Sequence, residues 1–492
     1  MANSNTTTFL KGISIQTVFT LIMGILEMVV FSVLSRLLTK SDFGYYAALM
    51  GVIAISQAVS EAGLGSAIVQ NKSSNERYVG TAFTLSVSLG VLITGLLWLF
   101  APTISTLIAD STIVTPLRIL SLVLIFNSFI SVGNALLYRD LDFKRIGILQ
   151  CISYVISATI GIIMAYLGLG IWSIVVYTVL YVFLNALLLF VLLPSRPSLG
   201  IHREYIGGIF SFGGWLTLSS LLNNFTQQID KLLLSKLLSV EALGAYNRPS
   251  GFVSTISTKI NSIFDTVLFP MLSSIQDEHN RIIDVYYRAI VLLNSFSVIL
   301  FSVFFFNAEL IISIFFGKNW LDLVPVLQII SISLVFSIDG RLVDCFFRSL
   351  NLVRIGFYIR LVGAIIMLIG IIVGARFGII GVAASIVISN VLIIVIKMVV
   401  LNKKIHASLR TMCLLWIKAL KPAIPIFIVG FVFLLFFSGS ILYSIFFACI
   451  FCLILFFEFI IYPNSVGQEY ITYIYPSIHS IILKLGLKKG NE

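Results

Sequence analysis

Long apolar runs recur along the chain and constrain its fold more than any other feature. A helix that crosses the hydrocarbon core of a bilayer needs about 20 mostly apolar residues. Fourteen segments of the 492-residue chain meet this requirement, near residues 12–35, 43–69, 79–108, 113–137, 147–167, 170–193, 208–233, 244–270, 285–308, 323–347, 356–375, 379–400, 413–437 and 440–462. Their apolar residues run continuously instead of alternating, which favours helices over barrel strands. The sequence therefore predicts an all-α polytopic membrane protein of about 14 transmembrane helices.

The shortage of charge excludes most other classes of protein. Charged residues make up 11% of the chain and hydrophobic residues 59%, whereas a soluble domain carries about 25% charged residues. So few charges cannot cover a soluble multidomain enzyme, and disordered chains are far less hydrophobic. The five cysteines are scattered through apolar segments, and the Cys449–Cys452 pair lies inside a predicted helix, so we expect no disulfide framework.

The basic residues are sorted between the two predicted sides of the membrane. With the N-terminus in the cytoplasm, 23 of the 32 Lys and Arg residues fall on the cytoplasmic side, as the positive-inside rule requires. An even number of helices places the C-terminus there as well, and the first helix is expected to be an uncleaved signal anchor. The same loops explain most of the net charge of +11; they predict contacts with anionic membrane lipids and no nucleic-acid partner.

Two pairs of segments match each other in order and spacing. At a shift of 200 residues, Ser35–Tyr46 lies over Ser235–Tyr246 with identical Ser, Leu, Leu, Gly and Tyr residues. At a shift of 209, Tyr138–Gly147 lies over Phe347–Gly356 with identical Arg, Leu, Arg, Ile and Gly residues. Because six is even, two six-helix lobes would be parallel repeats, which are typical of alternating-access transporters. The predicted parts are an N-terminal lobe in 1–200, a C-terminal lobe in 201–405, helices 13 and 14 in 406–465, and a cytoplasmic tail in 466–492.

The predicted tail has a composition of its own. It alternates apolar and polar residues and contains Lys484, Lys488 and Lys489 near its end. Two interpretations stay open, an amphipathic segment lying on the inner leaflet and a frayed terminus.

Polar and charged residues inside the predicted helices share helix faces. Such residues are costly in a bilayer and mark candidate functional sites. At helical spacing they form stripes in the first two helices of each lobe: Gln16, Thr20 and Glu27; Gln57 and Glu61; Asn223, Gln227 and Asp230 beside Asn224, Gln228 and Lys231; and Arg248, Thr255, Lys259 and Ser262 beside Thr258, Asn261 and Asp265. The 200-residue shift places Glu27 over Gln227 and Glu61 over Asn261, which predicts one central polar cavity.

Structural interpretations of several of these residues stay open. Lys231 lies near a predicted helix end, where its side chain can snorkel to the membrane surface. Glu27 and Glu61 can each pair with a neighbouring Arg or Lys. A further group is interpreted as a structural ion-pair cluster or loop boundary and not as a substrate site: Asp339, Arg341 and Asp344.

Motifs for covalent, nucleotide or metal chemistry are absent from the sequence. It contains no G-x-x-x-x-G-K-[ST] loop, no H-E-x-x-H helix and no G-x-S-x-G turn. The four His residues are far apart in predicted loops and in the tail. We therefore expect no metal site, no cofactor and no enzymatic activity.

Several short motifs occur in a fixed order across residues 8–460. They are Asp42-Phe43-Gly44-Tyr45-Tyr46, Glu61-Ala62-Gly63-Leu64, Arg139-Asp140 before Phe143, Gly168-Leu169-Gly170-Ile171-Trp172-Ser173, Ser211-Phe212-Gly213, Asp230, Gly244-Ala245-Tyr246 and Phe269-Pro270. In this ordered set the chain resembles the polysaccharide-transport (Wzx-type) flippases of the multidrug/oligosaccharidyl-lipid/polysaccharide exporter superfamily, in the branch with fourteen helices. Ser235 departs from the pattern, because many of these flippases have Gly there.

The resemblance implies a protein of the bacterial cytoplasmic membrane that flips a polyprenyl-pyrophosphate-linked oligosaccharide outward, in lipopolysaccharide or exopolysaccharide export. It also implies H⁺ or Na⁺ as the coupling ion, and a polysaccharide polymerase and other assembly proteins as partners. Cationic and amide groups would bind the pyrophosphate and the sugar hydroxyls: Arg248, Lys259, Lys231, Asn223, Asn224 and Gln227. Carboxylates would bind the coupling ion: Glu27, Glu61, Asp230 and Asp265.

Other functions stay open at this point. A drug or cation antiporter of the same superfamily would favour a cavity dominated by carboxylates over one that contains Arg and Lys. A membrane glycosyltransferase or polysaccharide ligase would need a large external loop, whereas the longest predicted external stretch, near residues 307–322, is modest. A structural scaffold is disfavoured by the internal duplication.

Overall fold

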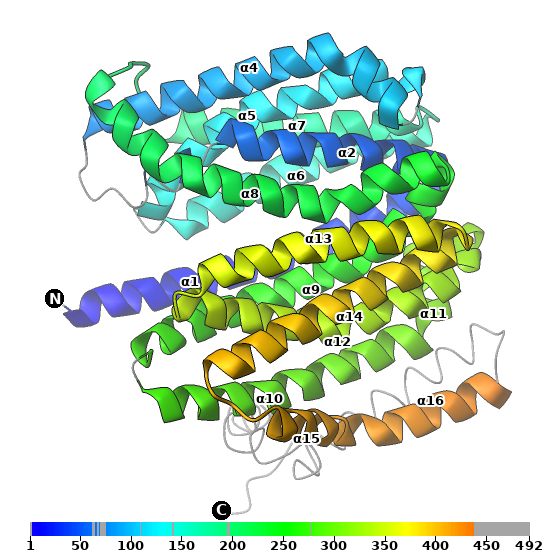
Figure 1. Ribbon diagram of the computed structural model, residues 1–492. Helices are drawn as coiled ribbons and strands as arrows, with labels where there is room; N and C mark the ends of the chain where they lie inside the picture. Colours follow the sequence, from blue (N-terminus) through cyan, green and yellow to red (C-terminus); the bar gives the residue numbers. More distant parts are fainter. Residues whose placement is uncertain are drawn as a thin grey trace, which may run out of the picture. The chain divides into compact units, whose positions relative to one another are not determined.

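The apolar runs form helices, because a backbone in lipid must satisfy its hydrogen bonds within its own segment. In the computed structural model the described elements are helices and turns (Figure 1). The structure describes residues 2–61, 64, 65, 68, 75–108, 110–139, 142–193, 197–276 and 278–436, and these contain no strand. The expected all-α membrane fold is confirmed. The chain divides into two compact units, Met1–Asn247 and Arg248–Glu492.

Ten helices of the described chain are long and apolar enough to cross a membrane, and a bent helix pair would make an eleventh. Two long helices, α8 (Arg203–Leu237) and α9 (Val240–Ser274), are not among the ten, although each has 35 residues. At 1.5 Å per residue each is about 50 Å long, more than a bilayer core requires. Their polar stripes lower their hydropathy. The predicted helix at 440–462 and the tail lie outside the described residues, so the count of 14 stays a prediction.

The first unit is built from helices that pack in pairs. They are α1 (Ala2–Leu37), α2 (Lys40–Glu61), α4 (Glu76–Ile108), α5 (Val114–Arg139), α6 (Phe143–Tyr166), α7 (Ile171–Leu192) and α8, with a 3-10 turn, η1, at Ser111–Ile113. α4 packs on α5, α6 on α7 and α2 on α8 (Figure 1). Fully buried Leu49, Leu117 and Leu124 lie in the core between α2 and α5. The lobe boundary predicted at residue 200 stays a prediction, and α8 packs inside the first unit.

Two glycines that the 200-residue shift superposes make a reciprocal backbone contact within this unit. A Cβ atom on Gly44 would overlap the carbonyl group of Val240, and a Cβ atom on Gly244 would overlap the carbonyl oxygen of Lys40. The same shift places Lys40 over Val240. The start of α2 and the start of α9 therefore pack backbone against backbone, an approach that only glycine permits.

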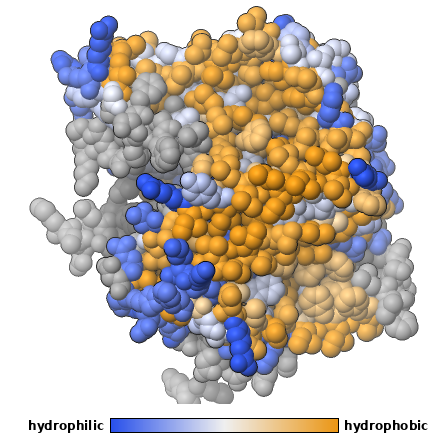
Figure 2. Space-filling model, viewed as in Figure 1, coloured by the Kyte–Doolittle hydropathy of each residue, from blue (hydrophilic) through white to orange (hydrophobic). Residues whose placement is uncertain are grey.

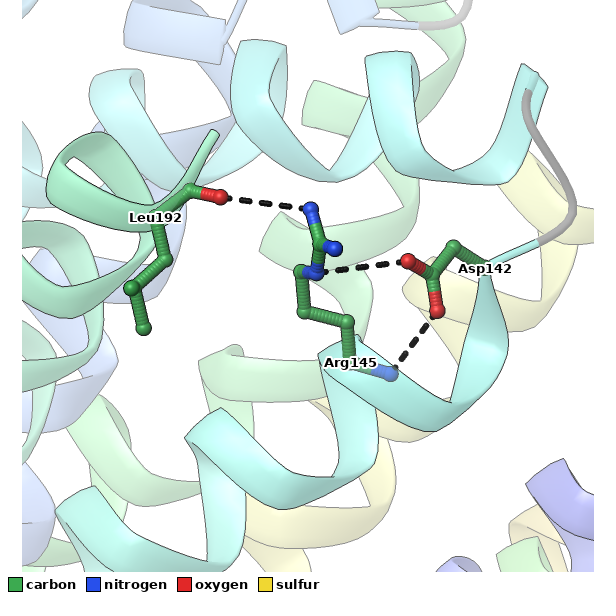
Figure 3. Close-up of polar contacts among 3 residues, drawn as sticks. All are labelled: Asp142, Arg145 and Leu192. Atoms are coloured by element: carbon green, nitrogen blue, oxygen red, sulfur yellow. Dashed lines mark hydrogen bonds and ion pairs between the residues drawn. The ribbon is translucent and has the colours of Figure 1, made fainter. Parts of the chain in front are cut away.

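Arg145, near the start of α6, forms a hydrogen bond to the end of α7. The Oδ1 atom of Asp142 accepts a hydrogen bond from the Arg145 backbone N–H at 3.1 Å and caps α6. The Arg145 side chain lies with Nε 3.3 Å from the Asp142 carboxylate, and its Nη1 donates to the Leu192 carbonyl at 3.2 Å (Figure 3). Leu192 is the last residue of α7, so Arg145 also satisfies a carbonyl group at a helix C-terminus, where a cation is favoured.

The second unit continues α9 and adds the remaining described elements. They are α10 (His279–Phe306), α11 (Ala308–Phe315), η2 (Lys318–Leu323), α12 (Val324–Ser349), α13 (Val353–Ala375), α14 (Gly378–Lys404), α15 (Leu409–Ala419), η3 (Lys421–Ala423) and α16 (Ile424–Phe436). α12 packs on α10 and on α14 around fully buried Tyr286, Val343 and Phe346, and α13 packs on α14. The predicted external stretch at 307–322 folds into α11 and η2, which pack against α12.

The predicted helix at 413–437 is interrupted in the structure. Its two parts, α15 and α16, meet at an angle of 51° across η3. Pro422 lies in this break. Because proline has no N–H group and clashes with the preceding turn, the helical hydrogen-bond ladder does not continue through it.

Apolar side chains also cover the outside of the helices. Figure 2 shows hydrophobic residues over broad areas of the visible surface, with hydrophilic residues gathered mainly toward its margins. On α4, Val91, Leu92 and Leu99 are each more than half exposed. Apolar surfaces of this extent mark a membrane contact, so these side chains face acyl chains and not water.

We predict that Gly44→Ala and Gly244→Ala each destabilise the protein. The added methyl groups would meet backbone atoms that cannot rotate away, and overpacking of this kind costs about 1–3 kcal/mol. Thermal unfolding of the detergent-purified protein should show melting temperatures lowered by a few degrees. Gly95→Ala is the matched control, since a Cβ atom there meets nothing within 4 Å. Equal melting temperatures for all three variants would contradict the proposed close contact.

Candidate functional site

A carboxylate and an ammonium group lie next to each other on α8. Asp230 is buried; its Oδ1 accepts the Lys231 backbone N–H at 2.8 Å, and its Oδ2 accepts the Tyr246 hydroxyl at 3.5 Å. Lys231 is half-buried, and its Nζ donates to Gln228 Oε1 at 2.8 Å. The two opposite charges interact electrostatically, which lowers the cost of holding both in an apolar setting.

Three amide side chains extend this polar surface along α8. Asn223 and Asn224 are half-buried, and Gln227 is exposed. Among the described residues none of the three amide groups forms a side-chain hydrogen bond. An amide group carries both hydrogen-bond donors and an acceptor.

Glu27 of α1 lies beside a group of tyrosines that were not among the predicted site residues. Its carboxylate interacts electrostatically with Tyr154 of α6 and Tyr181 of α7. The Tyr154 ring packs edge-on against Tyr177 and Tyr181, with ring centroids 5.8 Å apart in both pairs. The i, i+4 spacing of Tyr177 and Tyr181 is the signal that would have placed both on one face. The first unit therefore places phenol groups near the Glu27 carboxylate.

Glu61, the last residue of α2, forms a side-chain hydrogen bond within the same helix. It is half-buried, and its Oε1 accepts a hydrogen bond from Gln57 Nε2 at 2.6 Å. The predicted shared face of these two residues is thus a direct contact. Glu61 forms no ion pair with any residue that the structure describes.

The remaining predicted site residues lie on α9. Arg248 is half-buried and is the first residue of the second unit. The side chains of Lys259 and Asp265 lie outside the described part of the structure. A single polar cavity formed by both lobes therefore stays a prediction.

The acidic and basic residues on α12 separate into different surroundings. Asp344 forms an ion pair with Lys397 of α14, with Nζ 2.7 Å from Oδ1. Arg341 is exposed, whereas Asp339 is fully buried. The ion-pair interpretation therefore fits Asp344 but not Asp339. Within the described ranges, no three His, Cys, Asp or Glu side chains come together as a group that could hold a metal ion.

The chain is similar in sequence to proteins of surface polysaccharide synthesis. It is 22% identical over 407 residues to the lipopolysaccharide biosynthesis protein WzxC of Escherichia coli strain K12, and the match covers 81% of each chain. It is 26% identical over 314 residues to the succinoglycan biosynthesis transport protein ExoT of Rhizobium meliloti strain 1021, covering 63% of this chain and 62% of ExoT.

The fold is that of two groups of solved membrane transporters. The lipid II flippase MurJ in an inward closed conformation superposes with a TM-score of 0.70, covering 92% of this chain and 99% of MurJ at 16% identity. An inward-facing multidrug resistance MATE family transporter of the MOP superfamily superposes with a TM-score of 0.64, covering 80% of this chain and 98% of the transporter at 15% identity.

A family model settles the relationship that the ordered motifs predicted. The model of the family described as polysaccharide biosynthesis protein matches residues 33–325. This range includes the motifs from Asp42 to Phe269-Pro270 that carried the resemblance. Because the match spans more than half of the 492 residues, the chain belongs to the polysaccharide biosynthesis protein family.

Proposed function

We propose that the chain flips a polyprenyl-pyrophosphate-linked oligosaccharide, a repeat unit of a cell-surface polysaccharide, across the bacterial cytoplasmic membrane by alternating access. One observation carries the proposal: sequence and fold point to the same activity. The sequence is similar to proteins named for lipopolysaccharide biosynthesis and succinoglycan transport, and the fold is similar to that of a lipid II flippase.

The chemistry of such a substrate matches the polar surface of α8. The substrate has an anionic pyrophosphate, a hydroxyl-rich glycan and an apolar tail. Lys231 offers an ammonium group held by neutral Gln228 and by Asp230, so an arriving pyrophosphate supplies a stronger, doubly charge-assisted partner. The amides of Asn223 and Asn224 can exchange hydrogen bonds with sugar hydroxyls. We assign Gln227, Arg248 and Lys259 to the same substrate surface.

Carboxylates in this apolar setting suit ion coupling. Glu61 accepts a hydrogen bond from a neutral amide, so a bound H⁺ or Na⁺ would cancel its half-buried charge. Glu27, which lies beside Tyr154 and Tyr181, is assigned to ion binding as well. Asp230 and Asp265 are assigned to the same role. We also assign cytoplasmic positions to both termini, and we expect a polysaccharide polymerase and other assembly proteins to act on the exported unit.

Drug or cation antiport is the second candidate, because a MATE family transporter shares the fold. The ammonium group of Lys231 beside Asp230 disfavours it, since a cationic drug would be repelled where a pyrophosphate is attracted. A membrane glycosyltransferase is disfavoured because α11 and η2 leave no large external loop in the region from α10 to α12.

Deletion of the gene should leave the lipid-linked oligosaccharide on the inner leaflet. The unit is assembled there, and without a flippase it accumulates while surface polysaccharide falls. Extraction of the lipid fraction and chromatography of the released glycans measure this directly. Unchanged lipid intermediates together with raised drug sensitivity would support the antiporter instead.

We predict that Lys231→Gln slows flipping by roughly tenfold to a hundredfold, because it removes a charge-assisted contact to the pyrophosphate. Restoration of surface polysaccharide in the deletion strain, at matched protein levels, measures the effect. Lys236→Gln is the control: Lys236 lies in the last turn of the same helix and is exposed. If both variants restore polysaccharide equally, Lys231 is not a substrate contact.

We predict that Glu61→Gln abolishes the dependence of flipping on an ion gradient. The substitution preserves the size of the side chain and its contact with Gln57 but removes the titratable, ion-binding carboxylate. Transport into vesicles with and without an imposed H⁺ or Na⁺ gradient measures the dependence. Glu76→Gln, at the exposed start of α4, should behave as the unmodified protein. A gradient response retained by Glu61→Gln would remove Glu61 from the coupling mechanism.

A further inference from the structure

A polar contact is buried where α10, α12 and α15 of the second unit meet. Asp339 of α12 has 0% of its surface exposed, and Asn294 of α10 has 1%. Asn294 Nδ2 donates to Asp339 Oδ1 at 2.8 Å, and Trp416 Nε1 of α15 donates to Asp339 Oδ2 at 3.1 Å. Each carboxyl oxygen of Asp339 therefore accepts one hydrogen bond from a neutral N–H group.

No cation compensates this carboxyl group among the described residues. The Tyr286 hydroxyl of α10 interacts with it electrostatically and is engaged as an acceptor from Asn402 at 3.1 Å. Lys397 of α14 is paired with Asp344. The other charged groups on the adjacent turns of α12 and α15 are exposed: Arg341 and Lys418. An ionised Asp339 would thus be a buried charge without a counter-ion, which is strongly unfavourable.

The same contact contains an acceptor that lacks a donor. Asn294 Oδ1 is buried and has no hydrogen-bond partner among the described residues. It belongs to the amide group that already faces Asp339. The O–H of a protonated carboxyl group is a donor. One proton on Asp339 would therefore remove the buried charge and add a donor beside the Asn294 amide, whose oxygen lacks one.

A proton fits this site better than a metal cation. Hard cations take several oxygen ligands, whereas among the described residues that bond Asp339 only Asn294 has a buried oxygen without a donor. The adjacent side chains on α12 are apolar: Val335, Phe336, Ile338, Leu342 and Val343.

We propose that Asp339 is a proton-binding site and that its occupancy controls how firmly α15 is held against α12. An ionised carboxylate accepts the Trp416 N–H as a charge-assisted hydrogen bond, which is shorter and stronger than the bond to a neutral acid. The Trp416 indole also stacks on Phe336, with centroids 5.5 Å apart and planes at 23°. Because η3 breaks the chain between α15 and α16 at 51°, α15 can shift as a short separate helix.

Proton binding at Asp339 does not depend on the proposed function, whereas its use in a transport cycle does. Infrared difference spectra of the full chain in lipid nanodiscs, recorded between acidic and alkaline pH without substrate, read the protonated carboxyl group directly. We expect a carboxyl C=O band that disappears on raising the pH and that is missing in Asp339→Asn. Asp344→Asn, which alters a carboxylate already paired with Lys397, should retain the band.

Two outcomes would overturn the proposal. The first is an Asp339→Asn spectrum that retains every pH-dependent carboxyl band, measured on protein with an unchanged elution profile and melting temperature. The second is loss of the band when Na⁺ replaces choline at constant pH, because the site would then bind a metal ion.

Trp416→Phe provides a second test that leaves Asp339 in place. It removes the N–H donor and preserves the aromatic ring, so the ionised form loses one hydrogen bond. The pH at which the band disappears should rise by about one unit. An unchanged pH dependence would refute the link between Asp339 and α15. A flippase assay that fails while the infrared band behaves as expected would contradict the proposed function and not the proton site.

Discussion

A bilayer core supplies no water to hydrogen-bond a polar group, and the rest of this structure depends on that constraint. Every described membrane segment is helical, so its backbone groups are paired internally. Where helices end, side chains complete the pairing, as Arg145 does for the Leu192 carbonyl. Polar side chains within helices also find local partners, as Gln57 does with Glu61. The few groups left incompletely compensated are therefore the best candidates for binding a substrate or an ion.

Gly44 contacts the start of α9 and Gly244 contacts the start of α2, at positions that the predicted repeat superposes. The predicted duplication would give a transporter two matched halves. The family is one of polysaccharide biosynthesis, and the polar groups on α8 offer surface chemistry suited to the proposed lipid-linked substrate.

Much of the fold and part of the site follow from the sequence, because both depend on local periodicity. The apolar runs predict most helices within a few residues, and i, i+4 spacing predicts the contact of Gln57 with Glu61. Features that require three helices to meet are not accessible this way. The tyrosines around Glu27 come from α6 and α7, and the partners of Asp339 come from α10 and α15. Pro422 is a signal for a helix break, but the apolar residues on both sides of it predict one continuous helix.

The central claim is that this chain alone moves a lipid-linked oligosaccharide between leaflets. Purified protein reconstituted into vesicles with a fluorescent polyprenyl-pyrophosphate-linked oligosaccharide tests it most directly, because a reductant or glycosidase added outside reaches only the outer leaflet. The account predicts that all of the labelled lipid becomes accessible in vesicles with the protein and about half in empty vesicles, with the Lys231→Gln variant slower than the unmodified chain. Accessibility that stays at the level of empty vesicles, with folded protein present and an ion gradient imposed, would contradict it.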